Sequence, residues 1–257
     1  MRPLLYSHRG ASIEQPENTL PSFRRAADIG VDAFETDAHM TSDGHIVVGH
    51  DPSGGRMCGV PREIRRTLLR EVQSWDAGRG FVDSDGRRPF AGKGYRMPTL
   101  EQLLQEFPDM PLNIDLKQRD PSMVETALDL LRRHNAEQRV TLASFSDDTM
   151  HKVRTLGYTG PTALAQREVI GLLALHPIAY KLLRRRGDAA QIPPRVGPID
   201  LSTPAFIDKC HRLGLRVDYW TINDPAHAER LLDAGADGIM TDDPAAIAPV
   251  FRARFGS

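Results

Sequence analysis

Short runs of apolar and β-branched residues alternate along this chain with longer segments in which apolar residues recur at helical spacing. Strand-like runs cover residues 4–8, 33–37, 112–117, 140–144, 162–165, 189–192, 216–220 and 238–241, and the run at 189–192 is the weakest. Strands that alternate with helices favour a parallel sheet with helical crossover connections. Eight strand–helix units in 257 residues predict an α/β fold, the TIM (β/α)8 barrel.

Start signals place several helices between these strands. Helices are expected over residues 99–107, 146–156, 224–234 and 243–257, where the starting residues are Thr99, Ser146, Asp224 with Pro225, and Asp243 with Pro244. The chain shows no internal repeat and no linker long enough to divide it. Residues 1–257 are therefore predicted to form one domain, with an insertion over about residues 52–97, after the second strand.

Composition excludes several classes of protein. With 33 Lys and Arg against 34 Asp and Glu, the formal net charge of −1 argues against a nucleic-acid binder. Cys58 and Cys210 lie far apart, so we expect neither a disulfide framework nor a zinc site, and a reducing compartment is indicated. The N-terminal residues lead directly into the first strand and leave no room for a cleavable signal peptide, which predicts a cytoplasmic protein.

An apolar stretch at residues 169–180 is broken by His176-Pro177 and ends in the basic segment 181–186. It is too short to cross a bilayer, which takes about 20 residues, so no transmembrane segment is predicted. Two interpretations stay open. The stretch is either a helix that packs on the barrel with an exposed basic end, or a helix that makes peripheral contact with an anionic membrane.

Polar motifs that no core requires follow one another within the first 51 residues. They are His8-Arg9-Gly10, Pro16-Glu17-Asn18-Thr19, Glu35-Thr36-Asp37, Thr41-Ser42-Asp43-Gly44 and His50-Asp51. Two histidines, an arginine and two carboxylates spaced by one residue are suited to metal-assisted attack on a phosphate ester. Further motifs are Pro98-Thr99-Leu100, Asn113-Ile114-Asp115-Leu116-Lys117, Ser144-Phe145, Trp220-Thr221-Ile222-Asn223, and the run from Gly235 to Asp242.

In this order, the motifs resemble the signature of the glycerophosphodiester phosphodiesterase family over almost the whole chain. The resemblance implies a phosphoric diester hydrolase that cleaves glycerophosphodiesters to sn-glycerol 3-phosphate and an alcohol. It assigns acid–base catalysis to His8 and His50, without saying which is the acid and which the base. One segment departs from the family pattern, because Asp115 stands before Leu116-Lys117 where a glutamate is usual. A metal would then sit closer to this strand or be reached through water.

Side chains alternate across a strand, so Glu35 and Asp37 point to one side, as do Asp115 and Lys117. At the C-terminal end of a barrel, three converging carboxylates from Glu35, Asp37 and Asp115 would repel one another. A divalent cation relieves this repulsion, and oxygen ligands favour Mg²⁺ or Ca²⁺, with Mn²⁺ also suitable. The alternative is that these acids pair with Arg9 and Lys117 without a metal.

Other side chains are candidates for contact with the substrate. Arg9 and Lys117 are suited to balance the negative charge of the phosphate. Trp220, at the end of the seventh strand, either forms an apolar wall for the substrate or packs against the barrel. His39 continues the alternation of Glu35 and Asp37, so it either touches substrate or metal or is an ordinary loop histidine.

The insertion, which the resemblance places on the active-site face, has two interpretations. A helix over residues 61–75 is expected within it. The insertion either caps the pocket and selects the leaving group, with Arg56, Arg62, Phe81 and Phe90 taking part, or is an ordered structural excursion.

Rival functions are a lysophospholipase D acting on lysophospholipids, an aldolase or isomerase acting on a sugar phosphate, and a non-catalytic barrel that binds phosphodiesters. The sixth strand carries no lysine for a Schiff base, and both acid–base histidines are present, which disfavours the last two. The expected partner is a small-molecule glycerophosphodiester. The sequence leaves open the oligomeric state and the choice between one-step hydrolysis and a cyclic phosphate intermediate.

Overall fold

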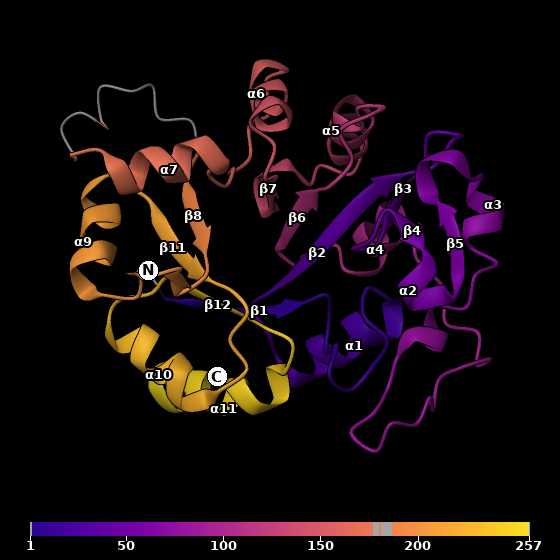
Figure 1. The fold of residues 1–257 in the computed structure, drawn as a ribbon, viewed down its shortest axis with the longest axis horizontal. Helices are drawn as coiled ribbons and strands as arrows, with labels where there is room; N and C mark the ends of the chain where they lie inside the picture. The colour runs from indigo at the N-terminus through magenta and orange to yellow at the C-terminus, as the bar shows by residue number, and fades with distance from the viewer. Residues whose placement is uncertain (1, 177–179, 181–186, 257) are drawn as a thin grey trace.

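The computed structural model describes residues 2–176, 180 and 187–256 (Figure 1). The apolar stretch begins in helix α7 (Gln166–Ala174), whereas the basic segment 181–186, on which the membrane interpretation depends, lies outside the described residues. Within the described part of the chain, none of the helices has the length and apolar character needed to span a bilayer.

A curved parallel sheet forms the centre of the molecule, with its strands in the order β7-β6-β2-β1-β12-β11-β8 (Figure 1). These strands are β1 (Leu4–His8), β2 (Ala33–Met40), β6 (Leu112–Leu116), β7 (Val140–Ala143), β8 (Ala189–Ile192), β11 (Arg216–Tyr219) and β12 (Gly238–Thr241). Seven of the eight predicted runs are therefore strands, and the prediction of a TIM-like barrel is confirmed. A short strand β3 (Ile46–Val48) pairs antiparallel with the end of β2.

The prediction that residues 162–165 form the fifth strand is wrong, although the segment lies where that strand was expected. Single parallel bridges join Leu142 to Thr162 and Ala163 to Ala189, so this segment lies between β7 and β8 and completes the ring. Regular pairing is interrupted because Pro161 has no N–H and the amide of Thr162 donates to the Asp188 carboxylate at 2.9 Å.

Helices cover the outside of the sheet (Figure 1). Besides α7, the longer ones are α1 (Leu20–Ile29), α4 (Leu100–Glu106), α5 (Val124–Arg133), α6 (Asp147–Thr155), α9 (Pro204–Arg212), α10 (Pro225–Asp233) and α11 (Pro244–Phe255). All four predicted N-caps are confirmed, because the side chains of Thr99, Ser146, Asp224 and Asp243 accept backbone N–H groups at the starts of α4, α6, α10 and α11.

The main core lies between the sheet and these helices. The ring of Phe34 on β2, for example, packs between Phe23 of α1 and Phe107, with centroid distances of 5.1 and 5.0 Å. Cys58 and Cys210 are both buried and free. Outside the insertion, the structure also contains the short 3-10 helix η3 (Glu137–Arg139) and a small hairpin of β9 (Arg195–Val196) and β10 (Ile199–Asp200).

The insertion lies beside β2 and β3 and has its own small core around Ile64, Trp75 and Met97 (Figure 1). Its elements are β4 (Ser53–Gly54), α2 (Gly55–Cys58), β5 (Val60–Glu63), η1 (Ile64–Arg66), α3 (Leu69–Val72) and η2 (Ala77–Gly80). The helix predicted over residues 61–75 is wrong, because residues 60–63 pair antiparallel with β4. Only one turn of α-helix forms after it, where the amide of Leu69 donates to the carboxylate of Asp43 at 3.0 Å.

Candidate active site

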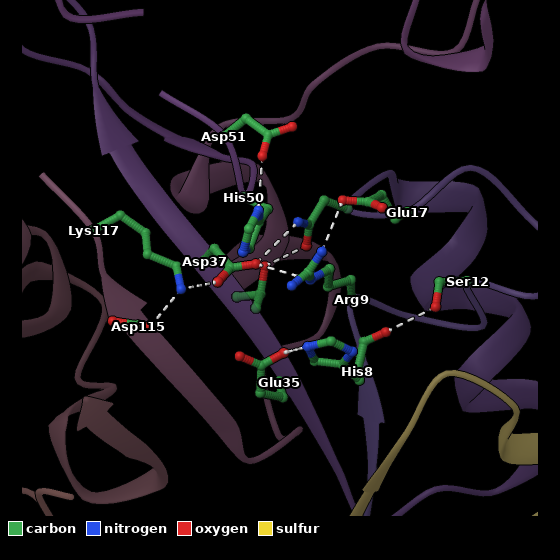
Figure 2. A network of polar contacts seen from close by, with 12 residues as sticks. His8, Arg9, Ser12, Glu17, Glu35, Asp37, His50, Asp51, Asp115 and Lys117 are labelled. Atoms are coloured by element: carbon green, nitrogen blue, oxygen red, sulfur yellow. Dashed lines mark hydrogen bonds and ion pairs between the residues drawn. The ribbon is translucent and has the colours of Figure 1, made fainter. Parts of the chain in front are cut away.

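The C-terminal ends of neighbouring barrel strands bring the predicted site residues together. His8 at the end of β1 is the register partner of Glu35 on β2, and Asp37 on β2 is the partner of Asp115 on β6. Figure 2 shows these side chains around one centre, together with Arg9, Lys117 and His50. Parallel strands that end at the same edge explain why residues so far apart in the sequence meet here.

His8 lies between two carboxylates. Its Nδ1 donates to Oδ1 of Asp242 at 2.6 Å, and its Nε2 lies 3.6 Å from Oε2 of Glu35. Burial lowers the pKa of His8, but the charge of Glu35 and the hydrogen bond to Asp242 outweigh burial, so the pKa is raised above its ordinary value. Ser12 and Asn223 also donate to Asp242 and fix its position. The sequence reasoning missed Asp242 as the partner of His8, although the last motif of the chain contains it.

A cluster of alternating charges lies beside His8. The ammonium of Lys117 lies between Oδ1 of Asp37, at 3.0 Å, and Oδ2 of Asp115, at 2.6 Å. Nε of Arg9 is 3.2 Å from the other oxygen of Asp37. Burial raises the pKa of Asp37, but Lys117 and Arg9 outweigh burial and lower it below its usual range. For Asp115, burial dominates and the pKa is raised despite Lys117.

The backbone around Arg9 is held in an uncommon conformation. Arg9 and Asn18 have left-handed φ angles of 61° and 56°, which non-glycine residues adopt at a cost of about 1 kcal/mol or more. Hydrogen bonds fix both, because the amide of Arg9 donates to the Glu35 carbonyl and the amide of Asn18 donates to the Arg9 carbonyl, each at 2.9 Å. The chain thereby aims the guanidinium of Arg9 at Asp37.

His50 enters the site from the loop that follows β3. Its Nδ1 donates to Oδ1 of Asp51 at 2.8 Å, and Nε of Arg56 binds the other oxygen of Asp51 at 2.6 Å. Arg56 belongs to α2 and also binds Glu17 at 2.7 and 2.8 Å, and Glu17 in turn pairs with Arg9. Burial raises the pKa of Asp51, but the bonds from His50 and Arg56 outweigh it and lower the pKa. The insertion is thus tied to the site through Arg56.

Other residues singled out in the insertion lie within its own packing. Arg62 pairs with Glu71 of α3. The rings of Phe81 and Phe90 pack together with centroids 4.9 Å apart, and Phe90 also packs against Tyr95. These contacts show an ordered segment, while selection of a leaving group by the insertion stays a prediction.

An aromatic pair stands beside Lys117. The ring of Trp220 contacts that of Phe145 edge-on, with centroids 6.3 Å apart, and Phe145 is 56% exposed. Nζ of Lys117 lies 5.8 Å from the centre of the Phe145 ring. Phe145 belongs to a motif that the sequence identified without a role. His39 differs, because it is buried and its Nε2 bonds to the carbonyl of His50.

The three acids expected to bind a metal reach the same end of the barrel but do not meet at one point. In the described residues, no three or more His, Cys, Asp or Glu side chains form a group that could hold an ion. Lys117 stands between Asp37 and Asp115, and Glu35 turns toward His8. The expected convergence of all three carboxylates is therefore not observed in this arrangement.

The donor chemistry nevertheless fits a hard divalent cation. Oε2 of Glu35 and Oδ1 of Asp115 are buried without a hydrogen-bond partner. Burial raises the pKa of Glu35 to about 8, which shows that its negative charge is poorly compensated. Buried carboxylate oxygens of this kind are the ligands that Mg²⁺ and Ca²⁺ prefer.

Comparisons with known proteins find similarity over most of the chain. The profile of the Glycerophosphoryl diester phosphodiesterase family matches residues 8–246. A protein named Glycerophosphodiester phosphodiesterase from Caldanaerobacter subterraneus is 29% identical over 95% of this chain and 96% of its own. Human Lysophospholipase D GDPD1 is 27% identical over 93% of this chain and 82% of its own. A solved Oleispira antarctica phosphodiesterase, in complex with the product sn-glycerol-3-phosphate, superposes with a TM-score of 0.77 at 22% identity, covering 97% of this chain and 96% of its own.

Proposed function

The chain belongs to the glycerophosphoryl diester phosphodiesterase family, a family of phosphoric diester hydrolases, and we propose that it cleaves glycerophosphodiesters to sn-glycerol 3-phosphate and an alcohol. One observation carries the proposal. Two histidines, each bonded through Nδ1 to a carboxylate, lie beside an arginine and a lysine at one barrel mouth. A sugar-phosphate aldolase or isomerase does not need this histidine pair.

His8 and His50 divide the proton transfers. Because Asp242 and Asp51 occupy the two Nδ1 atoms, Nε2 of each ring is the atom left to exchange a proton with the reacting groups. One histidine removes the proton from the attacking oxygen, and the other donates a proton to the leaving alkoxide. The carboxylate partners fix the tautomers and stabilise each ring when it becomes charged.

Arg9 and Lys117 bind the phosphodiester. A phosphoryl group gains negative charge on its non-bridging oxygens during the reaction, and fixed cations aimed at those oxygens stabilise the transition state. Trp220 and Phe145 supply an apolar wall next to Lys117, suited to the carbon atoms of the glycerol or of the alcohol.

Glu35, Asp37 and Asp115 would hold a divalent cation, Mg²⁺ or Ca²⁺ with Mn²⁺ as a further candidate. When bound, the cation would act as a Lewis acid toward the phosphate and would balance the charge of the carboxylates. The buried oxygens of Glu35 and Asp115 that lack a hydrogen-bond partner support this assignment. Two buried cysteines without a disulfide support the cytoplasm, a reducing compartment, as the location of the protein. We also propose that residues 1–257 form one domain.

The reaction is tested by measuring glycerol 3-phosphate release from glycerophosphocholine in a coupled assay with Mg²⁺, Ca²⁺, Mn²⁺ or a chelator. We expect turnover that depends on the added cation and stops with the chelator. Folded protein that releases no glycerol 3-phosphate with any of the three cations would contradict the proposed function.

A lysophospholipase D activity is the second candidate, supported by the human relative and by apolar side chains at the mouth. Ile13, whose amide donates to the Asp242 carbonyl, is 55% exposed, and Phe145 is exposed to a similar degree. Such a rim suits an acyl chain. Choline release from micellar lysophosphatidylcholine, compared with release from glycerophosphocholine, separates the two substrates.

The metal-free protein should lose stability as the pH rises. The pKa of Glu35 is about 8 in the folded state against an ordinary value of 4.5, so between these values the folded state binds a proton that the unfolded chain does not. The free energy of unfolding then decreases with rising pH. We expect Tm to fall by about 5 °C between about pH 5 and 8, corresponding to about 2 kcal/mol. Thermal unfolding followed by circular dichroism in chelator measures this.

Glu35→Gln is the matched variant, since it keeps the shape of the side chain and removes its titration. We expect a smaller slope in this variant, although not a flat one, because burial also raises the pKa of Asp115, which contributes a slope of the same sign. An unchanged slope in Glu35→Gln would show that another group is responsible. Added Mg²⁺ or Ca²⁺ should stabilise the wild type most at the alkaline end.

A further inference from the structure

His39 contacts the loop that carries His50, and the chemistry described above does not use it. It occupies the same side of β2 as Glu35 and Asp37 but is only 4% exposed, whereas the side chain of His50 is 35% exposed. It therefore does not present its ring to a substrate at the mouth. Its ring instead contacts the main chain of His50, where Nε2 lies 3.1 Å from the carbonyl oxygen.

The position of His39 follows from the hairpin that carries His50. The strands β2 and β3 pair antiparallel, with His39 opposite Val47, so the chain that leaves β3 runs back alongside β2 before it reaches His50. The amide of Gly49 donates to the Asp37 carbonyl at 2.9 Å. His39 thus supplies the second attachment of this loop to β2, at the catalytic residue itself.

The direction of the bond follows from the acceptor. A carbonyl oxygen only accepts, so Nε2 of His39 carries a hydrogen whether the ring is neutral or charged. Without this bond, the contacts that position His50 are the neighbouring Gly49 bond and the bond of its ring to Asp51, a carboxylate that Arg56 shares. Small displacements of a catalytic group are costly, since about 1 Å of misplacement lowers the rate by about a hundredfold.

We propose that His39 is a positioning residue, whose Nε2–H holds the main chain of His50 and so fixes the catalytic ring over the barrel mouth. The inference rests on the proposed acid–base role of His50. It assigns His39 neither to the metal nor to the substrate, the two functional roles that its strand position suggested.

The test compares three substitutions that differ in where they place an N–H donor. Glutamine carries its Nε2 three bonds from Cβ, as histidine does, whereas asparagine carries its nitrogen one bond closer, and leucine has no donor. For His39→Leu we expect kcat for glycerophosphocholine to fall about 10- to 100-fold with KM within about twofold of wild type, because alignment and not binding is lost. His39→Gln should recover most of kcat, and His39→Asn should not.

Kinetics are referred to the folded fraction, and His45→Leu serves as the matched control because His45 lies in the same hairpin with an exposed side chain. We expect wild-type kcat for this control and an unchanged cation concentration for half-maximal activation in His39→Leu. A higher cation requirement in His39→Leu would identify a metal ligand and overturn the proposal. Equal kcat in the Gln, Asn and Leu variants, or wild-type kcat in His39→Leu, would also overturn it.

Kinetics of His50→Ala beside the His39 variants separate the positioning role of His39 from the acid–base role of His50. Full activity of His50→Ala would refute the acid–base role of His50, whatever the His39 variants do. An inactive His50→Ala together with a fully active His39→Leu would refute only the positioning role.

Discussion

Replacing His50, the proposed acid or base, by alanine should lower kcat for glycerophosphodiester hydrolysis by about a thousandfold, within the range of about 10² to 10⁴ that a positioned acid or base contributes. The ring supplies a proton-transfer group that no neighbour replaces, because Asp51 is bonded to Arg56 and lies on the far side of Nδ1. KM should change little, since Arg9 and Lys117, the proposed ligands of the phosphate, remain in place. Steady-state kinetics at saturating divalent cation measure both parameters.

His45→Ala is the control for this substitution, because it removes an exposed histidine from the same hairpin. We expect wild-type kcat and an unchanged Tm. A loss of less than tenfold in His50→Ala would exclude His50 as the acid or base. His8→Ala should lose activity to a similar extent, because it removes the other proposed proton-transfer group.

Replacing Lys117 by methionine should damage both stability and turnover. The ammonium stands between two carboxylates whose side chains are 2% exposed, for Asp37, and 10% exposed, for Asp115. Removing one partner of a buried ion pair costs about 3 kcal/mol or more, since the remaining charges are left uncompensated. Loss of a cation aimed at the phosphate should lower kcat about 100-fold. Urea unfolding in chelator and kinetics at saturating cation measure the two effects.

Lys152→Met is the matched substitution at the surface, where Lys152 pairs with the exposed Glu125. Exposed pairs contribute about 0 to 1 kcal/mol, so we expect little change in unfolding and none in kcat. If Lys117→Met were no less stable than Lys152→Met, the two carboxylates would not depend on the ammonium. Divalent cations should restore part of the stability of Lys117→Met, because a cation bound by Asp37 and Asp115 would compensate the negative charge that the missing ammonium balanced.

Local patterns in the chain were sufficient for most of the fold. Strand-length apolar runs separated by capped helices predict the barrel, because periodicity and N-caps depend on neighbours within a few residues. The exceptions are segments whose conformation depends on distant partners. Residues 60–63 form a strand because β4 pairs with them, and residues 162–165 are limited to single bridges because Asp188 takes the amide of Thr162.

Ordered motifs likewise identified the family, and they singled out His8 and His50 as the proposed acid–base pair. Alternation along β2 and β6 correctly placed Glu35, Asp37 and Asp115 at one end of the barrel. The same alternation did not decide the role of His39, because it predicts the side of the strand on which a side chain lies but not how deeply that side chain is buried. The burial of His39 depends on the loop that carries His50, which the β2–β3 hairpin brings back to this residue.

The charge partners within the site required the folded chain. His8 bonds to Asp242, which lies near the opposite end of the sequence. Arg56 joins Glu17 to Asp51. Lys117 lies between Asp37 and Asp115, two acids that the sequence predicted as metal ligands. Periodicity states which way a side chain points, whereas its partner depends on which strand ends meet around the barrel. Composition and spacing therefore specified the chemical groups of this protein, and closure of the sheet assigned each group its neighbour and so its pKa.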